Sequence, residues 1–361
     1  MPGMTIAPDQ EPLTIKTGGK VLDGWLSASV TRGVERLPSG FSVELTETYP
    51  GQAERAVVSP FAPCQVFLGA DLILTGYIDV YGPKYDRESH TVIIQGRSLT
   101  SDLVDCSVDI DAITAGSSTW EINAGTIGAA AKMICSPYNI EVVLPDGDAK
   151  LDSTRPFVLA PGMTCFQLIE EMARTVEMLL WDDARGRLVI SKVGKIRAGC
   201  PLVEGVNIEV GSARLSADQR YSTVMVLAQT PVDDGSGPHI GFKKTATDTA
   251  VPRKRLLMLV SDLPGPNGDW AQQRATWEVN RRAGRSQLFK ISVTGWRDSA
   301  GVLWTPNTVV KVQSPDLKVN TDLQIVEATW TRSEAGTSTL LTLMPPQGLQ
   351  PQPYHFLPLT G

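Results

Sequence analysis

The feature that most constrains the fold is an order of predicted strands that occurs twice in the chain. Residues 65–95 predict a short strand, a turn containing Asp71, a long strand, a loop and a third strand. Residues 309–343 repeat this order around a turn containing Asp316, with similar element lengths. Sequence identity between the stretches is low, so the pattern fits either two related β-rich units or two β-meanders that are alike by chance.

The rest of the chain divides around this repeat. Short strands bounded by turn residues predict a small antiparallel β-barrel over residues 1–104. The apolar period then becomes helical, which predicts an α+β domain with two helices over residues 105–200. The second of these helices follows Gly162, where Thr164 and Gln167 have the spacing of a capping box.

β character returns over residues 201–345, where we expect a second barrel with one helix at about 268–284, ended by Gly284. Residues 230–249 are rich in Gly, Pro, Asp and Thr and are interpreted as a loop. Residues 346–361 predict an extended C-terminal tail. The predicted fold class is therefore mixed β and α+β and multidomain, with two similar small antiparallel β-barrels and an α+β domain with two helices.

Composition excludes several classes of protein. Apolar residues make up 42% of the 361 residues and charged residues 20%, as in ordinary globular proteins. The formal net charge of −6 argues against a protein that grips nucleic acid. No run approaches the roughly 20 apolar residues of a membrane helix, and residues 1–19 contain no apolar signal segment. We therefore expect synthesis in the cytoplasm and no membrane insertion.

No pattern of catalytic, metal-binding or cofactor-binding residues is found. The three histidines (His90, His239 and His355) lack metal-ligand spacing, and His90 is expected to be an exposed strand residue. There is no nucleophile elbow and no phosphate-binding loop. The five cysteines form no CxxC pair and are expected to be buried thiols. Adjacent carboxylates at residues 170–171 predict a solvated helix face, and those at 182–183 and 233–234 predict turns.

Six residues are candidates for a subunit or partner interface. On the helix near residue 275, Trp270, Arg274, Trp277 and Arg281 share one band, whereas small residues form a separate stripe that would pack on a sheet. The band is either a surface ladder in which Arg stacks on Trp or a contact surface for another subunit. Trp296 and Trp304 flank a turn at Gly301, and fit either a hairpin core or an interface.

Nine blocks of residues stand out in order along the chain: 76–79, 85–92, 96–98, 102–107, 274–278, 282–286, 295–297, 301–307 and 345–346. Together these blocks resemble the Mu-type baseplate hub proteins of contractile-tailed phages, and the resemblance extends from about residue 15 to 345. The motifs are structural, so the resemblance transfers no catalytic residue.

This resemblance implies a homotrimer in which two similar barrels per chain form a ring with pseudo-sixfold symmetry. Such a ring joins the hexameric tail tube to the trimeric central spike in the virion baseplate. The partners implied are a second and third copy of the chain, the tube protein, the spike protein and other baseplate proteins. DNA would pass through the ring without specific binding, and a negative lumen would suit that passage.

Three other functions remain open at this stage. A tail-associated peptidoglycan-degrading enzyme would need a catalytic constellation that the sequence does not display. A cell-wall-binding module could lie in residues 105–200. The spike protein of a type VI secretion system would need a long β-helical repeat after the second barrel, and no such repeat is visible.

Overall fold

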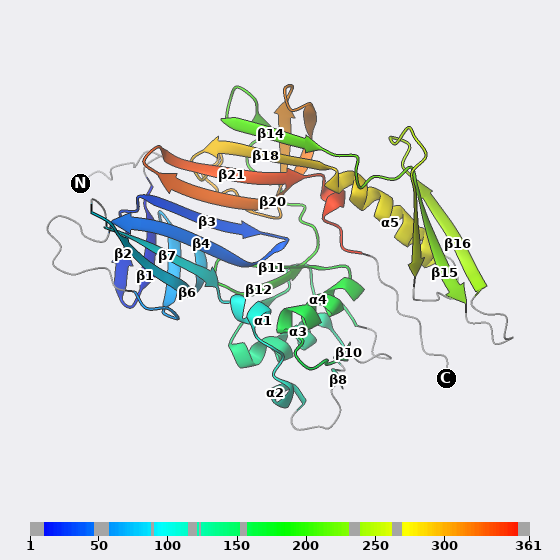
Figure 1. Cartoon of the computed structure of the whole chain (residues 1–361), viewed down its shortest axis with the longest axis horizontal. Coiled ribbons are helices and arrows are strands. Elements are labelled where there is room, and N and C mark those ends of the chain that lie inside the picture. The colour runs from blue at the N-terminus through cyan, green and yellow to red at the C-terminus, as the bar shows by residue number, and fades with distance from the viewer. Residues whose placement is uncertain are drawn as a thin grey trace.

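The computed structural model describes residues 11–46, 58–87, 90–114, 121–122, 124–151, 157–230, 239–261 and 269–352. One large sheet runs through the upper part of the molecule in Figure 1. A domain with most of the helices lies below it, and an arm made of a long helix and a small sheet extends to the right. No helix among the described residues is long and apolar enough to cross a bilayer.

The large sheet joins strands from both ends of the chain. The first unit contributes β1 (Leu13–Thr17), β2 (Lys20–Leu22), β3 (Ser27–Gly33), β4 (Arg36–Thr46), β5 (Pro63–Leu68), β6 (Asp71–Tyr85) and β7 (His90–Ser98). The second unit contributes β13 (Leu202–Val203), β14 (Val210–Leu215), β18 (Gln287–Thr294), β19 (Val309–Ser314), β20 (Val319–Ser333) and β21 (Gly336–Met344). Strands β20 and β3 pair antiparallel and so connect the two units.

The two units have the same strand order. In the first unit the neighbours are β3, β4, β7, β6 and β5, and in the second they are β14, β18, β21, β20 and β19. The meanders also match in length, because β5 and β19 have 6 residues, β6 and β20 have 15, and β7 and β21 have 9. The repeat predicted from residues 65–95 and 309–343 is therefore present in the topology of the structure.

Backbone details follow the same repeat. Each long strand has a register shift after an isoleucine, Ile78 in β6 and Ile325 in β20. Each isoleucine exchanges backbone hydrogen bonds with the segment before the short strand, where Phe61 and Asn307 both have a positive φ, 68° and 65°. A left-handed residue and a bulge at matching places indicate one backbone design used twice.

The fold is mostly β with few helices and has more than one domain. Its described strands form no closed sheet, so closure into two barrels, which the sequence predicted, is not shown. The inward-facing side chains of the two units instead form one shared core, which includes Phe41, Ile78, Phe289 and Trp330. The alternating burial of these strands agrees with the alternating apolar pattern of the sequence.

The middle domain has its own core, in which helices α3 and α4 pack together. Its elements are α1 (Ser101–Asp105), α2 (Ile110–Thr114), β8 (Glu121–Ile122), α3 (Ile127–Cys135), η2 (Ser136–Tyr138), β9 (Val142–Val143), β10 (Phe157–Val158), α4 (Cys165–Thr175), β11 (Leu179–Asp182) and β12 (Leu188–Ser191). The predicted capping box is present: Thr164 accepts from the Gln167 backbone N–H, and Gln167 accepts from the Thr164 N–H. The two predicted helices correspond to α3 and α4, and α1 and α2 are short additional turns.

A buried carboxylate fastens the middle domain to the first unit. Asp182, fully buried at the end of β11, accepts hydrogen bonds from the Ser39 N–H (2.9 Å), the Thr100 hydroxyl (3.0 Å) and the hydroxyls of Ser39 and Ser98. Arg32, also buried, donates to the Asp182 carbonyl at 3.2 Å. The interpretation of residues 182–183 as turn residues is therefore wrong for Asp182, because the sheet supplies donors that a turn would lack.

The arm departs from the expectation of a loop. It consists of β15 (Thr223–Thr230), β16 (His239–Thr247), β17 (Leu256–Ser261) and α5 (Asp269–Arg285), and β16 pairs antiparallel with β15. The interpretation of residues 230–249 as a loop is thus wrong over β16, an edge strand of the three-stranded sheet β16-β15-β17 with exposed polar side chains such as Lys243. Residues 231–238 lie outside the described part.

Helix α5 packs on the small sheet through Ala271 and Ala275, as the stripe of small residues predicted. Gly284 does not end the helix as expected. It lies inside the last turn, where an added Cβ would come 2.4 Å from the backbone nitrogen of Gly348 in η3 (Pro346–Gly348). This glycine allows the described start of the C-terminal tail to cross the helix at close range. Residues 353–361 of that tail are not described.

Candidate functional site

A cleft of about 950 Å³ separates α5 from the middle domain and the β3–β4 turn. Its walls come from five parts of the chain that are distant in sequence: α5, α4 with β11, the turn at Val34 and Glu35, the end of β14 with residues 216–219, and residues 349–352 of the tail. Arginines are its most prominent charged residues. They are Arg174, Arg214, Arg274, Arg281, Arg282 and Arg285.

Trp277 lies between two of these arginines. The guanidinium carbon of Arg274 is 4.8 Å from its ring centroid and that of Arg281 is 5.2 Å away. The indole N–H of Trp277 donates to the Gln350 carbonyl at 2.9 Å, and Arg281 donates to the same oxygen at 2.8 Å. The ladder in which Arg stacks on Trp is therefore present, and it also holds the start of the C-terminal tail.

Two glutamates partly balance the arginines. Glu278 pairs with Arg282 at 2.6 Å and with Arg274 at 3.6 Å, one helical turn away on either side. Glu35, from the β3–β4 turn, pairs with Arg285 and lies 3.8 Å from Arg281. Burial lowers the pKa of Arg274, and Glu278 acts in the opposite direction. The cleft thus keeps a surplus of guanidinium groups over carboxylates at its α5 wall.

The six candidate residues do not form one site. Arg274, Trp277 and Arg281 line the cleft. Trp270 packs instead toward the small sheet, beside Ala271 and Val226.

Trp296 and Trp304 are buried in the shared core of the sheet, 1% and 3% exposed, and Trp296 donates to the Thr331 carbonyl at 3.0 Å. These two residues take the hairpin-core position, so their ring faces are not available to a partner in this structure.

The cleft offers recognition rather than reaction chemistry. Planar guanidinium groups beside an indole bind carboxylates, carbonyls and aromatic rings of a protein partner. Within the described ranges, no group of three or more His, Cys, Asp and Glu side chains is placed to hold a metal ion. Glu170, one of the adjacent carboxylates, is paired with Arg174 at 2.6 Å on the surface of α4.

Sequence reasoning missed Glu35, Arg285 and Arg174, although they complete the cleft. The spacing of Glu278 with Arg274 and Arg282 was a readable signal, since side chains four apart meet on a helix. Glu35 gave no signal, because it reaches Arg285 across 250 residues of sequence.

Three family models match consecutive parts of the chain. Residues 12–98 match the model described as Mu phage baseplate assembly protein GpP-like, N-terminal. Residues 100–192 match baseplate hub protein gp44-like, second domain, and residues 267–352 match Mu phage baseplate assembly protein GpP, fourth domain.

Individual relatives cover nearly the whole chain. The baseplate hub protein gp44 of Escherichia phage Mu is 28% identical over 345 residues, which are 93% of this chain and 88% of that protein. The 43 kDa tail protein of prophage MuSo2 from Shewanella oneidensis has a TM-score of 0.83 at 28% identity, covering 95% of this chain and 100% of that one. A tail protein from Neisseria meningitidis MC58 shares the fold, with a TM-score of 0.73 at 22% identity over 92% of this chain and 96% of that one.

Proposed function

Since this chain belongs to the Mu-type baseplate hub family, and is thus a structural protein of the phage tail baseplate, we propose that it acts as a trimeric symmetry adaptor. Three copies form a ring in which six similar sheet units surround a channel. One face of the ring receives the hexameric tail tube, and the other receives the trimeric central spike. The work of the protein is mechanical and involves no chemical step.

The repeated strand order carries this proposal. A trimer offers only three equivalent positions per feature, whereas a sixfold tube needs six. Two units per chain with the same order of five strands, the same bulge and a left-handed residue at the same place supply six near-equivalent positions. A hub made of a single unit per chain could not meet both partners with closed cyclic symmetry.

The regions outside the two units are free to contact other baseplate chains. We assign this role to the α5 cleft, where Arg274, Trp277 and Arg281 form a surface of the type enriched in protein interfaces. The middle domain lies on one side of the large sheet and does not interrupt it (Figure 1). DNA would pass through the channel without specific contacts, in keeping with the net charge of −6.

Solution mass tests the ring. Light scattering behind size exclusion, over a range of concentrations, is expected to give three times the 39.0 kDa chain mass, alone or after addition of the tube and spike proteins. Negative-stain class averages of that species should show six peripheral densities around a channel. A mass of one chain under all of these conditions would overturn the proposal.

The enzyme and cell-wall-binding alternatives gain no support from the described residues. Besides arginines and paired glutamates, the cleft contains Ser216, whose hydroxyl donates to Asp218, and its described lining includes no histidine or cysteine. Incubation with purified peptidoglycan is expected to release no soluble sugar, and residues 105–200 are not expected to remain bound to sacculi.

A further inference from the structure

The pairing between β20 and β3 shows how two sheet units of this kind join edge to edge within one chain. Seven residue pairs form this junction, from Glu327 opposite Gly33 to Ser333 opposite Ser27, with Trp330 opposite Val30. On one side of the junction is the far end of a long strand, beyond its bulge. On the other side is the first strand of the following unit.

The equivalent strands of the two units can be matched residue by residue. Across four strands of the first unit, Ile78 faces Gly96, Gly96 faces Phe41 and Phe41 faces Val30. Across four strands of the second unit the facing residues, in the same order, are Ile325, Leu343, Phe289 and Ala213. Both paths start at the last residue before the bulge, so Val30 of β3 corresponds to Ala213 of β14.

The same match places Pro83 at the position of Trp330. Trp330 lies five residues beyond Ile325 in β20, and Pro83 lies five residues beyond Ile78 in β6. In the second unit this part of the long strand is covered by β3. In the first unit, residues 80–85 pair with β7 on one side, and no described strand lies on the other.

Strand β14 has an outer edge that no described strand covers. It pairs with β18 only, at the end of the described large sheet, and all six of its residues are exposed, including Val210 (67%) and Leu215 (58%). In β3, by contrast, the alternate residues Ala28, Val30 and Arg32 are buried. The exposure of β14 is what β3 would show without β20 beside it.

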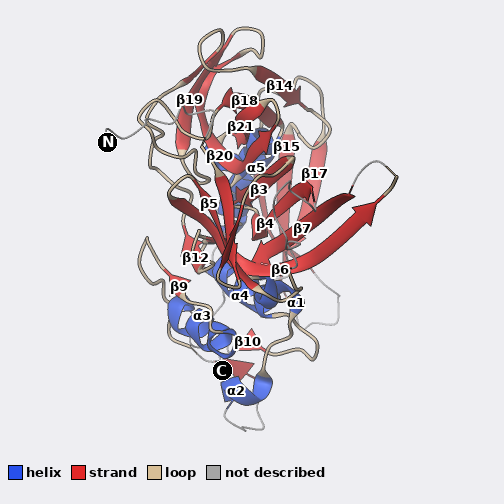
Figure 2. Cartoon of the chain, turned by 90° about the vertical axis from the view of Figure 1, so that its left-hand side faces the viewer, coloured by secondary structure: helices blue, strands red, loops and turns tan. Residues whose placement is uncertain are grey.

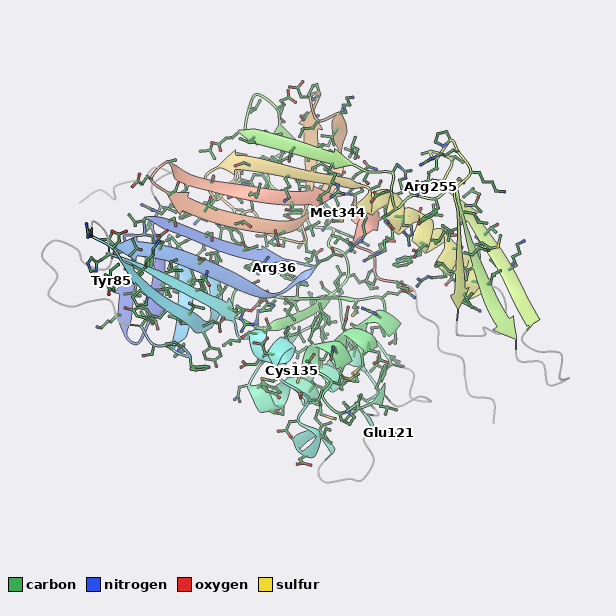
Figure 3. All side chains as sticks on the ribbon, viewed as in Figure 1. Arg36, Tyr85, Glu121, Cys135, Arg255 and Met344 are labelled. Atoms are coloured by element: carbon green, nitrogen blue, oxygen red, sulfur yellow. The ribbon has the colours of Figure 1, made fainter. Side chains whose placement is uncertain are left out.

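The far end of the β6–β7 hairpin extends away from the rest of the molecule (Figure 2). Tyr85 lies at its tip, 79% exposed (Figure 3). Pro83 and Lys84 are residue types that protect edge strands against unspecific pairing. The hairpin therefore extends far enough to contact a neighbouring copy, and Pro83 and Lys84 disfavour unspecific strand pairing at its edge.

We propose that the far end of β6 pairs antiparallel with β14 of the next copy of this chain, in the register of the internal β20–β3 junction. Pro83 lies opposite Ala213 of the next copy, and Lys84 lies opposite its Ser212. This proposal rests on the ring proposed above and specifies which edges join its subunits. Each copy contributes the far end of β6 to one neighbour and β14 to the other neighbour. The contact is therefore heterologous, and the ring closes after three copies.

The junction between copies is weaker than the internal one for a physical reason. Pro83 supplies no N–H, and the pair Pro83–Ala213 buries less apolar surface than Trp330–Val30. A weaker contact suits a ring that forms from folded chains during assembly. The expected consequence is a trimer that dissociates on dilution while each chain keeps its large sheet intact.

Paired cysteines test the register. Residues directly opposite on antiparallel strands have Cα atoms about 4.5–5.5 Å apart, within the range that a disulfide spans. Lys84→Cys combined with Ser212→Cys is therefore expected to give covalent dimers and trimers on non-reducing gels after mild oxidation. Each single variant should stay largely monomeric on the gel, which controls for the native cysteines.

Two matched controls complete the experiment. Ser29→Cys with Thr331→Cys places the equivalent pair at the internal junction, where residues 29 and 331 are opposite, and should give a disulfide within one chain. Lys84→Cys with Val210→Cys is a diagonal pair at about 7–8 Å, too long for efficient bridging. A strong band from Lys84–Ser212 and a weak one from Lys84–Val210 supports the proposed register.

The failures are distinguishable. A protein that has trimeric mass and forms the internal disulfide, but gives no covalent dimer from Lys84 and Ser212, retains the ring and loses the proposed strand pairing. Equal cross-linking of the direct and diagonal pairs also overturns the register. A monomeric mass under every condition rejects the ring, and the pairing with it.

Discussion

The first and second units share a strand order and differ in what has been added to it. The turn between β3 and β4 consists of Val34 and Glu35, whereas the connection between the corresponding strands β14 and β18 contains the arm, with three strands and α5. The pairing around each connection is nevertheless the same. An antiparallel sheet tolerates a large insertion at a hairpin turn, because the ladder of hydrogen bonds depends on the strands and not on what links them.

The units also differ in what holds their outer ends. Arg32 in the first unit is buried beside Asp182 of the middle domain, and the corresponding residue of the second unit, Leu215, is exposed. The first unit is thus fixed on two sides, by β20 and by the middle domain. In the second unit, no described strand covers the outer edge of β14, which the proposed ring would use.

The largest expected effect separates the internal junction from the far end of β6. Trp330→Ala removes a fully buried ring from the shared core and should lower the free energy of unfolding by about 3–5 kcal/mol. Pro83→Ala at the matching position of the first unit should change it by less than about 0.5 kcal/mol. Urea unfolding of dilute protein measures both free energies of unfolding. Equal losses would contradict the view that position 330 is covered by a neighbouring strand within the chain while the matching position 83 is not.

The next effect concerns the fastening of the first unit. Asp182→Ala removes the carboxylate that the hydroxyls of Ser98 and Thr100 share and leaves Arg32 with Asp183 alone as its acidic neighbour, so we expect a loss of about 3 kcal/mol. Asp183→Ala is the control, because Asp183 is partly exposed and pairs with Arg187 in the β11–β12 turn; its loss should be about 1 kcal/mol. A milder effect at Asp182 than at Asp183 would contradict the role given to the buried carboxylate.

A smaller effect should have opposite signs at the two left-handed residues. Phe61 is 88% exposed with φ 68°, so Phe61→Gly relieves backbone strain and should stabilise the protein by about 1 kcal/mol. The side chain of Asn307 accepts from the Gly194 N–H at 2.7 Å and from Gln324 at 3.1 Å. Its loss in Asn307→Gly should outweigh the relief and destabilise by about 1 kcal/mol. Thermal unfolding of Phe61→Gly and Asn307→Gly measures the change in stability of each variant. A change of the same sign in both would contradict the predicted difference.

The last effect, which appears only at alkaline pH, is a pH dependence in the core of the first unit. Burial raises the pKa of the Cys64 thiol to about 12, with a further contribution from Asp79. The thiol stays neutral in the folded chain below that value, so its contribution to stability is complete below the ordinary thiol pKa and is lost as the pH rises toward 12. Brief alkylation at pH 8.5 followed by mass mapping should leave Cys64 unmodified until denaturant is added.

Local signals made much of the fold predictable. The apolar stripe and capping box located α4, the Asp-rich turn located the β11–β12 hairpin, and alternation located both meanders. Strand β16 was not predicted, because its sequence combines Gly, Lys and Thr, which are not typical of a strand with one buried face. In the structure its pairing with β15 outweighs that composition.

Long-range pairing was not predictable from one sequence. The contact of Thr31 with Thr329 across the β3–β20 junction spans 298 residues and has no local signature. The same is true of Glu35 in the α5 cleft. Trp296 and Trp304 show that residue type alone does not distinguish a core position from an interface position. Only the burial of their side chains in the structure separates the two.

The arm leaves and re-enters the large sheet at one point. The Ser216 N–H donates to the Ser286 carbonyl at 2.8 Å, so the two ends of the inserted segment are in direct contact. An insert whose ends touch behaves as an exchangeable module, because any domain with adjacent termini can be spliced there without stretching the strands on either side. A tail of this kind can change what its hub carries on the outside while the large sheet stays the same.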